Sequence, residues 1–95
     1  MTVIHVQGKN SGNIMLYALS TCGWCQRTKR LLNDLGVEYY YLDMDKSAGD
    51  EKEKAIKEVR NWNPDVNFPT IIIDNKKCII GFKEDEIREV LAGGQ

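Results

Sequence analysis

The sequence has no long apolar run and almost no imbalance of charge. No stretch approaches the ~18 apolar residues that a membrane-spanning helix needs. Residues 1–5 lack the basic segment and apolar core of a secretion signal. The 13 Lys and Arg residues nearly balance the 14 Asp and Glu residues, whereas nucleic-acid-binding proteins usually present a basic face. We therefore expect a cytoplasmic protein with no membrane or nucleic-acid partner.

Cysteine is scarce, and its spacing is informative. The 95 residues are expected to form one domain, residues 1–95, with a modest core. Three cysteines are too few, and odd in number, for the disulfide framework of a small secreted protein. Cys22 and Cys25 form a C-x-x-C pair, which is typical of redox chemistry or metal binding. Structural zinc usually needs four ligands, and Cys78 and His5 are isolated, so we expect no metal site.

Hydrophobic patterns predict seven elements in the order βαβαββα. Continuous apolar runs predict buried strands, and apolar residues at helical spacing predict amphipathic helices. The predicted strands are residues 14–19, 37–44, 69–73 and 78–80, and the predicted helices are residues 22–35, 50–62 and 84–91. Residues 2–6 alternate weakly and allow one extra N-terminal strand. This order predicts an α/β fold in which helices flank both faces of a mixed sheet of about four strands.

Short polar and glycine signals predict where these elements turn or end. Gly36 and Gly93 are expected to follow the first and last helices, because glycine is common just after a helix. Asp74 and Asn75 tolerate positive φ and predict a tight hairpin turn. Cys78 lies among isoleucines and is expected to be an inert core residue.

The C-x-x-C pair lies between a predicted buried strand and a helix, which is the context expected for redox chemistry. Residues three apart share a helix face, so the two sulfurs can form and break a disulfide. Unpaired N–H groups at the helix N-terminus favour a thiolate, which makes Cys22 the predicted nucleophile and Cys25 the resolving thiol. We expect Gly23 to keep the neighbouring backbone accessible. Trp24 is either a docking wall for a partner or simply an exposed aromatic residue.

Three segments together resemble the glutaredoxin family: Cys22-Gly23-Trp24-Cys25, Asn67-Phe68-Pro69-Thr70 and Gly81-Phe82 before the last helix. The resemblance covers about residues 14–91 and implies a thioredoxin-like fold and thiol–disulfide oxidoreductase activity. It also implies a cis Phe68–Pro69 bond facing the cysteines, with Phe68 contacting a bound peptide or glutathione-like ligand through its main chain. The substrate-binding residues would then be Gly23, Trp24, Phe68, Pro69, Thr70, Gly81 and Phe82. The alternative for Pro69 is that it only begins an edge strand.

The sequence departs from the glutathione-using members at three places. Leu19 replaces a lysine, Phe68 replaces a valine before the proline, and a glycine pair is reduced to Gly81. These departures favour an electron donor other than glutathione. Gly81-Phe82-Lys83 resembles redoxins served by a thioredoxin reductase, whereas C-G-W-C resembles dithiol and mycothiol-linked glutaredoxins. The donor is therefore expected to be a thioredoxin reductase or a low-molecular-weight thiol, with glutathione still open.

Two functions remain open from the sequence. The first is a monomeric carrier that reduces protein or small-molecule disulfides through Cys22 and Cys25 and needs no further cofactor. The alternative is a protein that stores or transfers a [2Fe–2S] cluster, because glutaredoxins with glycine after the first cysteine, here Gly23, include cluster-binding members. Such a cluster has four sulfur ligands, so a dimer and two external thiols would be required.

Overall fold

All of the predicted elements are present in the computed structural model, which describes residues 3–93. The strands are β1 (Ile4–Val6), β2 (Ile14–Ala18), β3 (Tyr39–Asp43), β4 (Thr70–Ile73) and β5 (Lys77–Ile80), and the helices are α1 (Gly23–Leu35), α2 (Gly49–Trp62) and α3 (Glu84–Arg88). The optional N-terminal strand is formed, so the sheet has five strands rather than about four. Thr2, at the start of the predicted first strand, lies outside the described residues.

Several predicted ends differ from the observed ones by one to three residues. The strand predicted at residues 37–44 runs only from Tyr39 to Asp43, because Met44–Lys46 form a 3-10 helix. The last helix keeps α-helical hydrogen bonding only to Arg88 and continues as a π-helical segment, Glu89–Gly93. Gly93 is therefore the last residue of this segment and does not follow it. Wider turns of this kind are common where helices end.

The strands form one mixed sheet in the order β1-β3-β2-β4-β5. Strands β2 and β3 are parallel, as their connection through α1 predicts, and the other neighbours are antiparallel. The hairpin between β4 and β5 turns at Asp74 and Asn75, whose φ angles are 53° and 55°. The prediction of a tight turn with positive φ at both residues is therefore confirmed.

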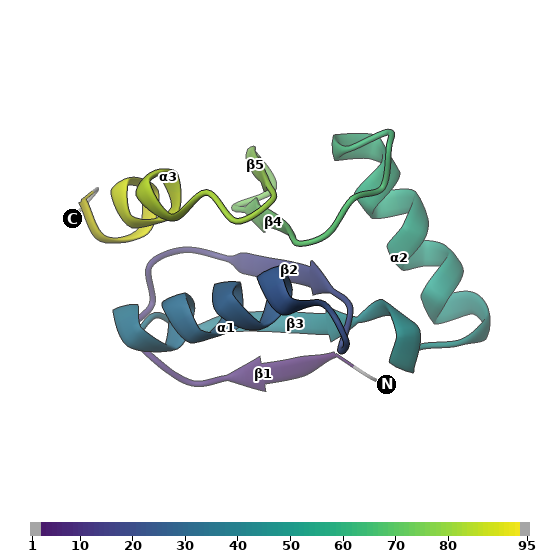
Figure 1. Cartoon of the computed structure of the whole chain (residues 1–95), viewed down its shortest axis with the longest axis horizontal. Coiled ribbons are helices and arrows are strands. Elements are labelled where there is room, and N and C mark those ends of the chain that lie inside the picture. The colour runs from purple at the N-terminus through teal and green to yellow at the C-terminus, as the bar shows by residue number, and fades with distance from the viewer. Residues whose placement is uncertain (1–2, 94–95) are drawn as a thin grey trace.

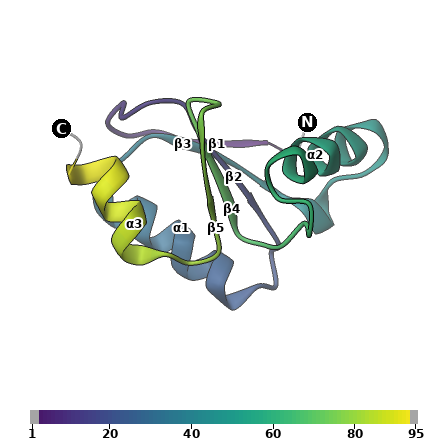
Figure 2. The ribbon, with the colours of Figure 1, turned by 90° about the horizontal axis from the view of Figure 1, so that it is seen from above.

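The sheet carries a hydrophobic core on each face. Figure 2 shows α1 and α3 together on one face and α2 on the other. The α1–α3 core contains alternate β2 residues such as Leu16, together with Leu32 of α1 and Ile87 of α3. The α2 core contains the intervening Tyr17 together with Val59 of α2. Because both faces are covered, β2 is buried along most of its length, which is why it reads as a continuous apolar run.

The cysteine pair lies where the central strand β2 leads into α1 (Figure 1). Gly36 closes α1 with a φ of 71°, and its N–H bonds to the Asn33 carbonyl. Cys78 is not a core residue as predicted: it is partly exposed on the edge strand β5, beside Ile72, and belongs to neither core. Among residues 3–93, no helix is both long enough and apolar enough to cross a membrane.

Candidate active site

Cys22 is the N-cap of α1, so its sulfur lies at the helix N-terminus. Its backbone is extended, with φ −87° and ψ 120°, and the Cys25 N–H donates a hydrogen bond to Cys22 Sγ at 3.2 Å. An N-cap side chain normally accepts such a bond because the first N–H groups of a helix have no partner within it. The same N–H donation favours a negative charge on the sulfur. Cys22 is half-buried, so its sulfur combines activation with access.

Cys25 lies beneath Cys22 and is fully buried, at 0% exposure. Burial, followed by the hydrogen bond with Cys22, raises the pKa of the Cys25 thiol to about 12. Cys25 is thus held as a neutral thiol at neutral pH. The two cysteines therefore differ in access, which is the asymmetry expected of an attacking and a resolving thiol.

The turn before Cys22 is held by a hydrogen-bond cluster that the sequence did not reveal. Asp45 accepts a bond from the Ser20 N–H at 2.8 Å and a second from the Ser20 hydroxyl. These bonds hold the pKa of Asp45 below its usual value. Gln26 of α1 donates to the Ser20 carbonyl at 2.9 Å, and the Cys22 N–H donates to the Leu19 carbonyl at 3.1 Å. Together these bonds fix the approach of β2 to the nucleophile.

The loop that carries Pro69 is organised around the buried Asn63. Its amide donates to the Asn67 carbonyl at 3.2 Å, and Thr70 Oγ1 donates to the same carbonyl at 2.6 Å. The Phe68–Pro69 bond is cis, which confirms the implication of the family resemblance. Thr70 is fully buried at the start of β4 and its hydroxyl is used within the loop. The assignment of Thr70 to the substrate-binding residues stays a prediction, and its hydroxyl serves the loop itself.

The main chain at Phe68 has free hydrogen-bonding groups. Within residues 3–93, neither the N–H nor the carbonyl of Phe68 takes part in a hydrogen bond. Phe68 also packs against both hydrophobic cores, so its position is fixed from two sides. An unpaired, rigidly held peptide group is what an extended substrate segment can add to, as an extra strand adds to a sheet edge.

An aromatic pocket, formed by Trp24, Phe68, Pro69, Gly81 and Phe82, has a volume of about 270 Å³. Trp24 is 56% exposed, and its ring stacks on Phe82 with 5.7 Å between the centroids. The guanidinium carbon of Arg27 lies over the Trp24 ring, 5.0 Å from its centroid. The structure thus brings five of the seven predicted binding residues together. Gly23 is exposed, and a Cβ there would contact nothing within 4 Å, so it leaves the approach to Cys22 open.

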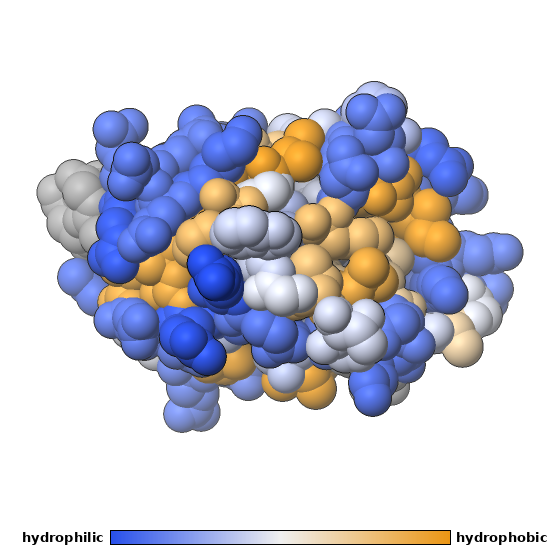
Figure 3. Space-filling view, in the orientation of Figure 1, coloured by the Kyte–Doolittle hydropathy of each residue, from blue (hydrophilic) through white to orange (hydrophobic). Residues whose placement is uncertain are grey.

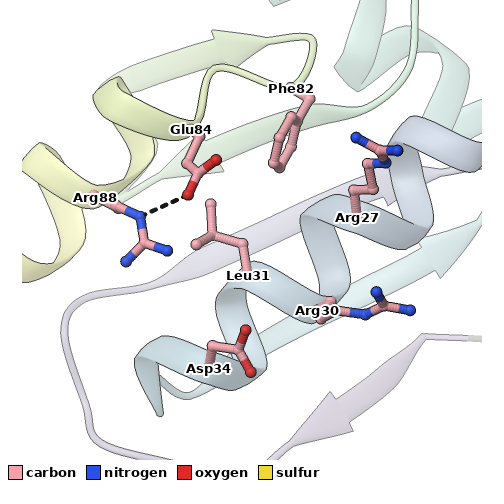
Figure 4. A pocket seen from close by; sticks show the side chains of 7 residues that line it. All are labelled: Arg27, Arg30, Leu31, Asp34, Phe82, Glu84 and Arg88. Atoms are coloured by element: carbon pink, nitrogen blue, oxygen red, sulfur yellow. Dashed lines mark hydrogen bonds and ion pairs between the residues drawn. The ribbon is translucent and has the colours of Figure 1, made fainter.

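A second groove, of about 280 Å³, runs between α1 and α3 next to Phe82. Figure 4 shows Leu31 of α1 pointing toward Glu84 of α3, near the Phe82 ring, while the Arg30 side chain extends away from α3. Glu84 accepts a hydrogen bond from Arg88 Nε at 2.9 Å, so these two charges satisfy each other. The groove is polar and mixed in charge, unlike the aromatic pocket.

Comparison with known proteins agrees with this geometry. The glutaredoxin family model matches residues 14–79, which include both cysteines and the cis-proline loop. The chain belongs to the glutaredoxin family. A glutaredoxin-like 8.6 kDa protein from the rubredoxin operon of Clostridium pasteurianum is 31% identical over 82% of this chain and 96% of its own length.

Solved structures give the same family and fold. The glutaredoxin of Methanosarcina mazei is 51% identical, with a TM-score of 0.90 over 97% of this chain and 89% of that chain. The methanoredoxin of Methanosarcina acetivorans is 50% identical, with a TM-score of 0.87 over 90% of each chain. The thioredoxin-like glutaredoxin fold predicted from the sequence is therefore confirmed, with a five-stranded sheet.

The residues of this glutaredoxin do not by themselves supply a ligand set for an iron–sulfur cluster. A [2Fe–2S] cluster needs four sulfur ligands, but Cys25 is fully buried and Cys78 lies beside Ile72, away from the β2 end that leads to Cys22. Within residues 3–93, no group of three or more His, Cys, Asp and Glu side chains could hold a metal. His5 bonds to Glu38 at 2.7 Å on the β1 side of the sheet.

Proposed function

We propose that this glutaredoxin reduces protein or small-molecule disulfides through a dithiol–disulfide cycle at Cys22 and Cys25. The Cys22 thiolate attacks one sulfur of the substrate disulfide, and that disulfide breaks as a mixed disulfide forms. The substrate sulfur that leaves takes a proton. Cys25 then loses its proton and attacks Cys22, which releases the second substrate thiol and leaves a Cys22–Cys25 disulfide. Two electrons and two protons pass to the substrate.

One observation carries this proposal: Cys22 Sγ accepts the Cys25 N–H at the N-terminus of α1 while the Cys25 sulfur lies buried behind it. The hydrogen bond supports nucleophilic attack by Cys22. Burial supports a waiting role for Cys25, because a neutral thiol does not compete for the substrate. The free peptide group of Phe68 and the aromatic pocket give a substrate segment a place to lie beside Cys22.

The experiment compares two serine variants. Cys22→Ser is expected to abolish reduction of a disulfide substrate, because no accessible thiolate remains. Cys25→Ser is expected to accumulate a mixed disulfide on Cys22, detectable as an added mass that dithiothreitol removes. Cys78→Ser is the matched control and is expected to keep full activity, because Cys78 is on the far edge strand. Full activity of Cys25→Ser on protein disulfides would contradict the two-cysteine cycle.

We further propose an electron donor other than glutathione. The first turn of α3 carries the three acidic residues Glu84, Asp85 and Glu86, which do not favour the carboxylates of glutathione. The test is steady-state reduction of one disulfide with NADPH, using either a thioredoxin reductase or glutathione with its reductase. Turnover with the thioredoxin reductase alone supports the proposal, and efficient turnover with glutathione contradicts it.

A further inference from the structure

A second pocket opens on the α2 side of the nucleophile. It has a volume of about 330 Å³, and its apolar lining comes from four separate parts of the chain: Leu19, Met44, Ile56, Val66 and Phe68. We call it the Leu19 pocket. Figure 3 shows apolar residues gathered across the middle of the face that Figure 1 presents, with hydrophilic residues on either side. Ligand sites in proteins are typically concave and lined mainly by apolar side chains, with a few polar groups that fix orientation.

The Leu19 pocket is close to the reacting sulfur. The Leu19 carbonyl accepts the Cys22 N–H at 3.1 Å, so the pocket wall and the nucleophile belong to one turn. Phe68 lines both the Leu19 pocket and the aromatic pocket that contains Trp24. The free peptide group of Phe68 thus lies between two pockets. A substrate segment that pairs with this peptide group places side chains near both pockets, because alternate side chains of a strand point to opposite sides.

The wall of the Leu19 pocket is held in an unusual backbone conformation. Val66 has a φ of 54°, which is rare for a β-branched residue. Its N–H donates to the Asn63 carbonyl at 2.8 Å, and Asn63 is itself buried. Backbone conformations of this kind persist where the surrounding structure holds them and are concentrated at binding sites. Hydrogen bonds therefore hold this wall of the Leu19 pocket in place.

Positive charge dominates the rim of the Leu19 pocket. Lys52 and Arg60 of α2 are exposed, and neither forms a salt bridge with another residue in the described range 3–93. The carboxylate of Asp45, the remaining charged group at the rim, accepts two hydrogen bonds from Ser20. The pocket therefore combines an apolar floor with two uncommitted cations. This combination fits a large apolar side chain that has a carboxylate next to it.

We propose that the Leu19 pocket selects protein substrates in which a large apolar side chain flanks the disulfide cysteine and an acidic side chain follows it. The apolar side chain enters between Leu19 and Ile56, and the carboxylate meets Lys52 and Arg60. This inference rests on the proposed function, because it assigns a substrate class to the same disulfide chemistry. It makes Leu19 and Ile56 residues that determine specificity.

The test measures single turnovers with the full chain, so that no electron donor is needed. The pre-reduced protein is mixed with cyclic disulfide peptides that differ only in the residues flanking each cysteine: Leu-Glu, Leu-Gln, Ser-Glu or Ser-Gln. The flanking pair is placed on both sides, so the direction of the peptide does not matter. Hydroxyethyl disulfide, which has no side chain to fill a pocket, reports the basal chemistry. The readout is the second-order rate constant for loss of protein thiols.

We expect leucine peptides to react about tenfold or more faster than serine peptides, the scale on which an apolar pocket discriminates. Glutamate should add about two- to fivefold over glutamine, as for an exposed ion pair. Ile56→Asn, on α2, should remove the leucine preference while the hydroxyethyl disulfide rate is retained. Leu19→Asn provides the same test from the turn before Cys22, read as the ratio of the leucine rate to the serine rate. Equal rates for leucine and serine peptides with the wild-type protein would overturn the proposal without any variant.

Charge at the rim is tested with a matched pair of double variants on α2. Lys52→Gln with Arg60→Gln should abolish the preference for glutamate. Lys54→Gln with Lys57→Gln removes the same charge from exposed positions that do not line the pocket and should keep that preference. Equal losses in both double variants would mean general electrostatic steering and would overturn the assignment of the rim.

Two further outcomes separate the possible failures. A leucine preference that survives Leu19→Asn and disappears in Trp24→Ala would assign the side chain to the aromatic pocket and overturn the proposal. Absence of reaction with hydroxyethyl disulfide and with every peptide would overturn the proposed function itself. Reaction with all of these disulfides but without a leucine preference would overturn only the substrate class.

Discussion

The resolving step should be controlled by the protonation of Cys25. Burial raises the pKa of this thiol from 9.0 to about 12. A shift of about three units leaves roughly 1000-fold less thiolate at neutral pH than an unshifted thiol would have. The higher pKa also makes the thiolate a better nucleophile, which with a Brønsted coefficient of ~0.4–0.5 recovers roughly twentyfold. The full shift would make resolution at neutral pH about 50-fold slower than for an unshifted thiol, and the mixed disulfide keeps the part of this effect that burial causes.

The pH dependence of resolution distinguishes a buried Cys25 from an ordinary one. In the mixed disulfide, Cys22 is no longer a thiol, so its hydrogen bond with Cys25 is lost, but burial, the larger cause of the shift, remains. The rate should therefore rise about tenfold per pH unit from about pH 7 to about pH 10. A thiol with a pKa near 9.0 would instead reach a plateau within this range.

Ellman's reagent provides the assay, in a Cys78→Ser background that removes the third thiol. Attack by Cys22 releases one coloured thiolate, and resolution by Cys25 releases a second in a phase whose rate does not depend on reagent concentration. Stopped-flow absorbance across the pH series gives the rate of the second phase, and Cys25→Ser, which should lack this phase, is the control. A second phase that levels off near pH 9 would refute the argument that burial controls resolution.

Three further predictions concern the fold. Leu16→Ala, at a fully buried position of the central strand, should lower the free energy of unfolding by about 2–5 kcal/mol, measured by urea denaturation; a cost near zero would contradict the core described here. Asn75→Ala should destabilise the β4–β5 turn by about 1–2 kcal/mol because φ is positive there, whereas Asn75→Gly should not, and equal losses would contradict the turn geometry. Cys25, Tyr17 and Tyr39 all have a pKa raised to about 12, so their neutral forms are favoured in the fold. Stability should be full below about pH 9 and should fall as the pH rises toward about 12, and a flat profile in this range would contradict the three shifts.

The parts of the fold that the sequence predicted are those set by local signals. The apolar run at residues 14–19, the helical spacing after Cys22 and the Asp74-Asn75 turn each depend on neighbouring residues alone. The strand–helix–strand unit also predicts that β2 and β3 are parallel. The position of Cys78 was wrong because an apolar strand pattern does not reveal whether the strand lies at a sheet edge. That property depends on the order of strands, which the pattern does not contain.

The candidate site was predicted less completely than the fold. The C-x-x-C pair at the start of a predicted helix predicted the roles of Cys22 and Cys25. The family resemblance predicted the cis-proline loop. The bonds from Ser20 to Asp45 were missed because they join residues 25 positions apart in the sequence. Thr70, whose buried hydroxyl bonds within the loop, does not line the aromatic pocket with the other predicted binding residues. The Leu19 pocket could not be predicted either, since the segments that line it meet only after the sheet has formed.

Phe68 contributes both to folding and to substrate binding, and this limits how substrate selectivity can change during the evolution of this fold. Phe68 contacts both cores and lines both pockets, so any change there alters folding and recognition together. Trp24 is mostly exposed and lines the aromatic pocket but not the Leu19 pocket, so it can change with little effect on the cores. New partner preferences would therefore arise most readily at Trp24, while the residue before the cis-proline stays constrained by the stability of the whole molecule.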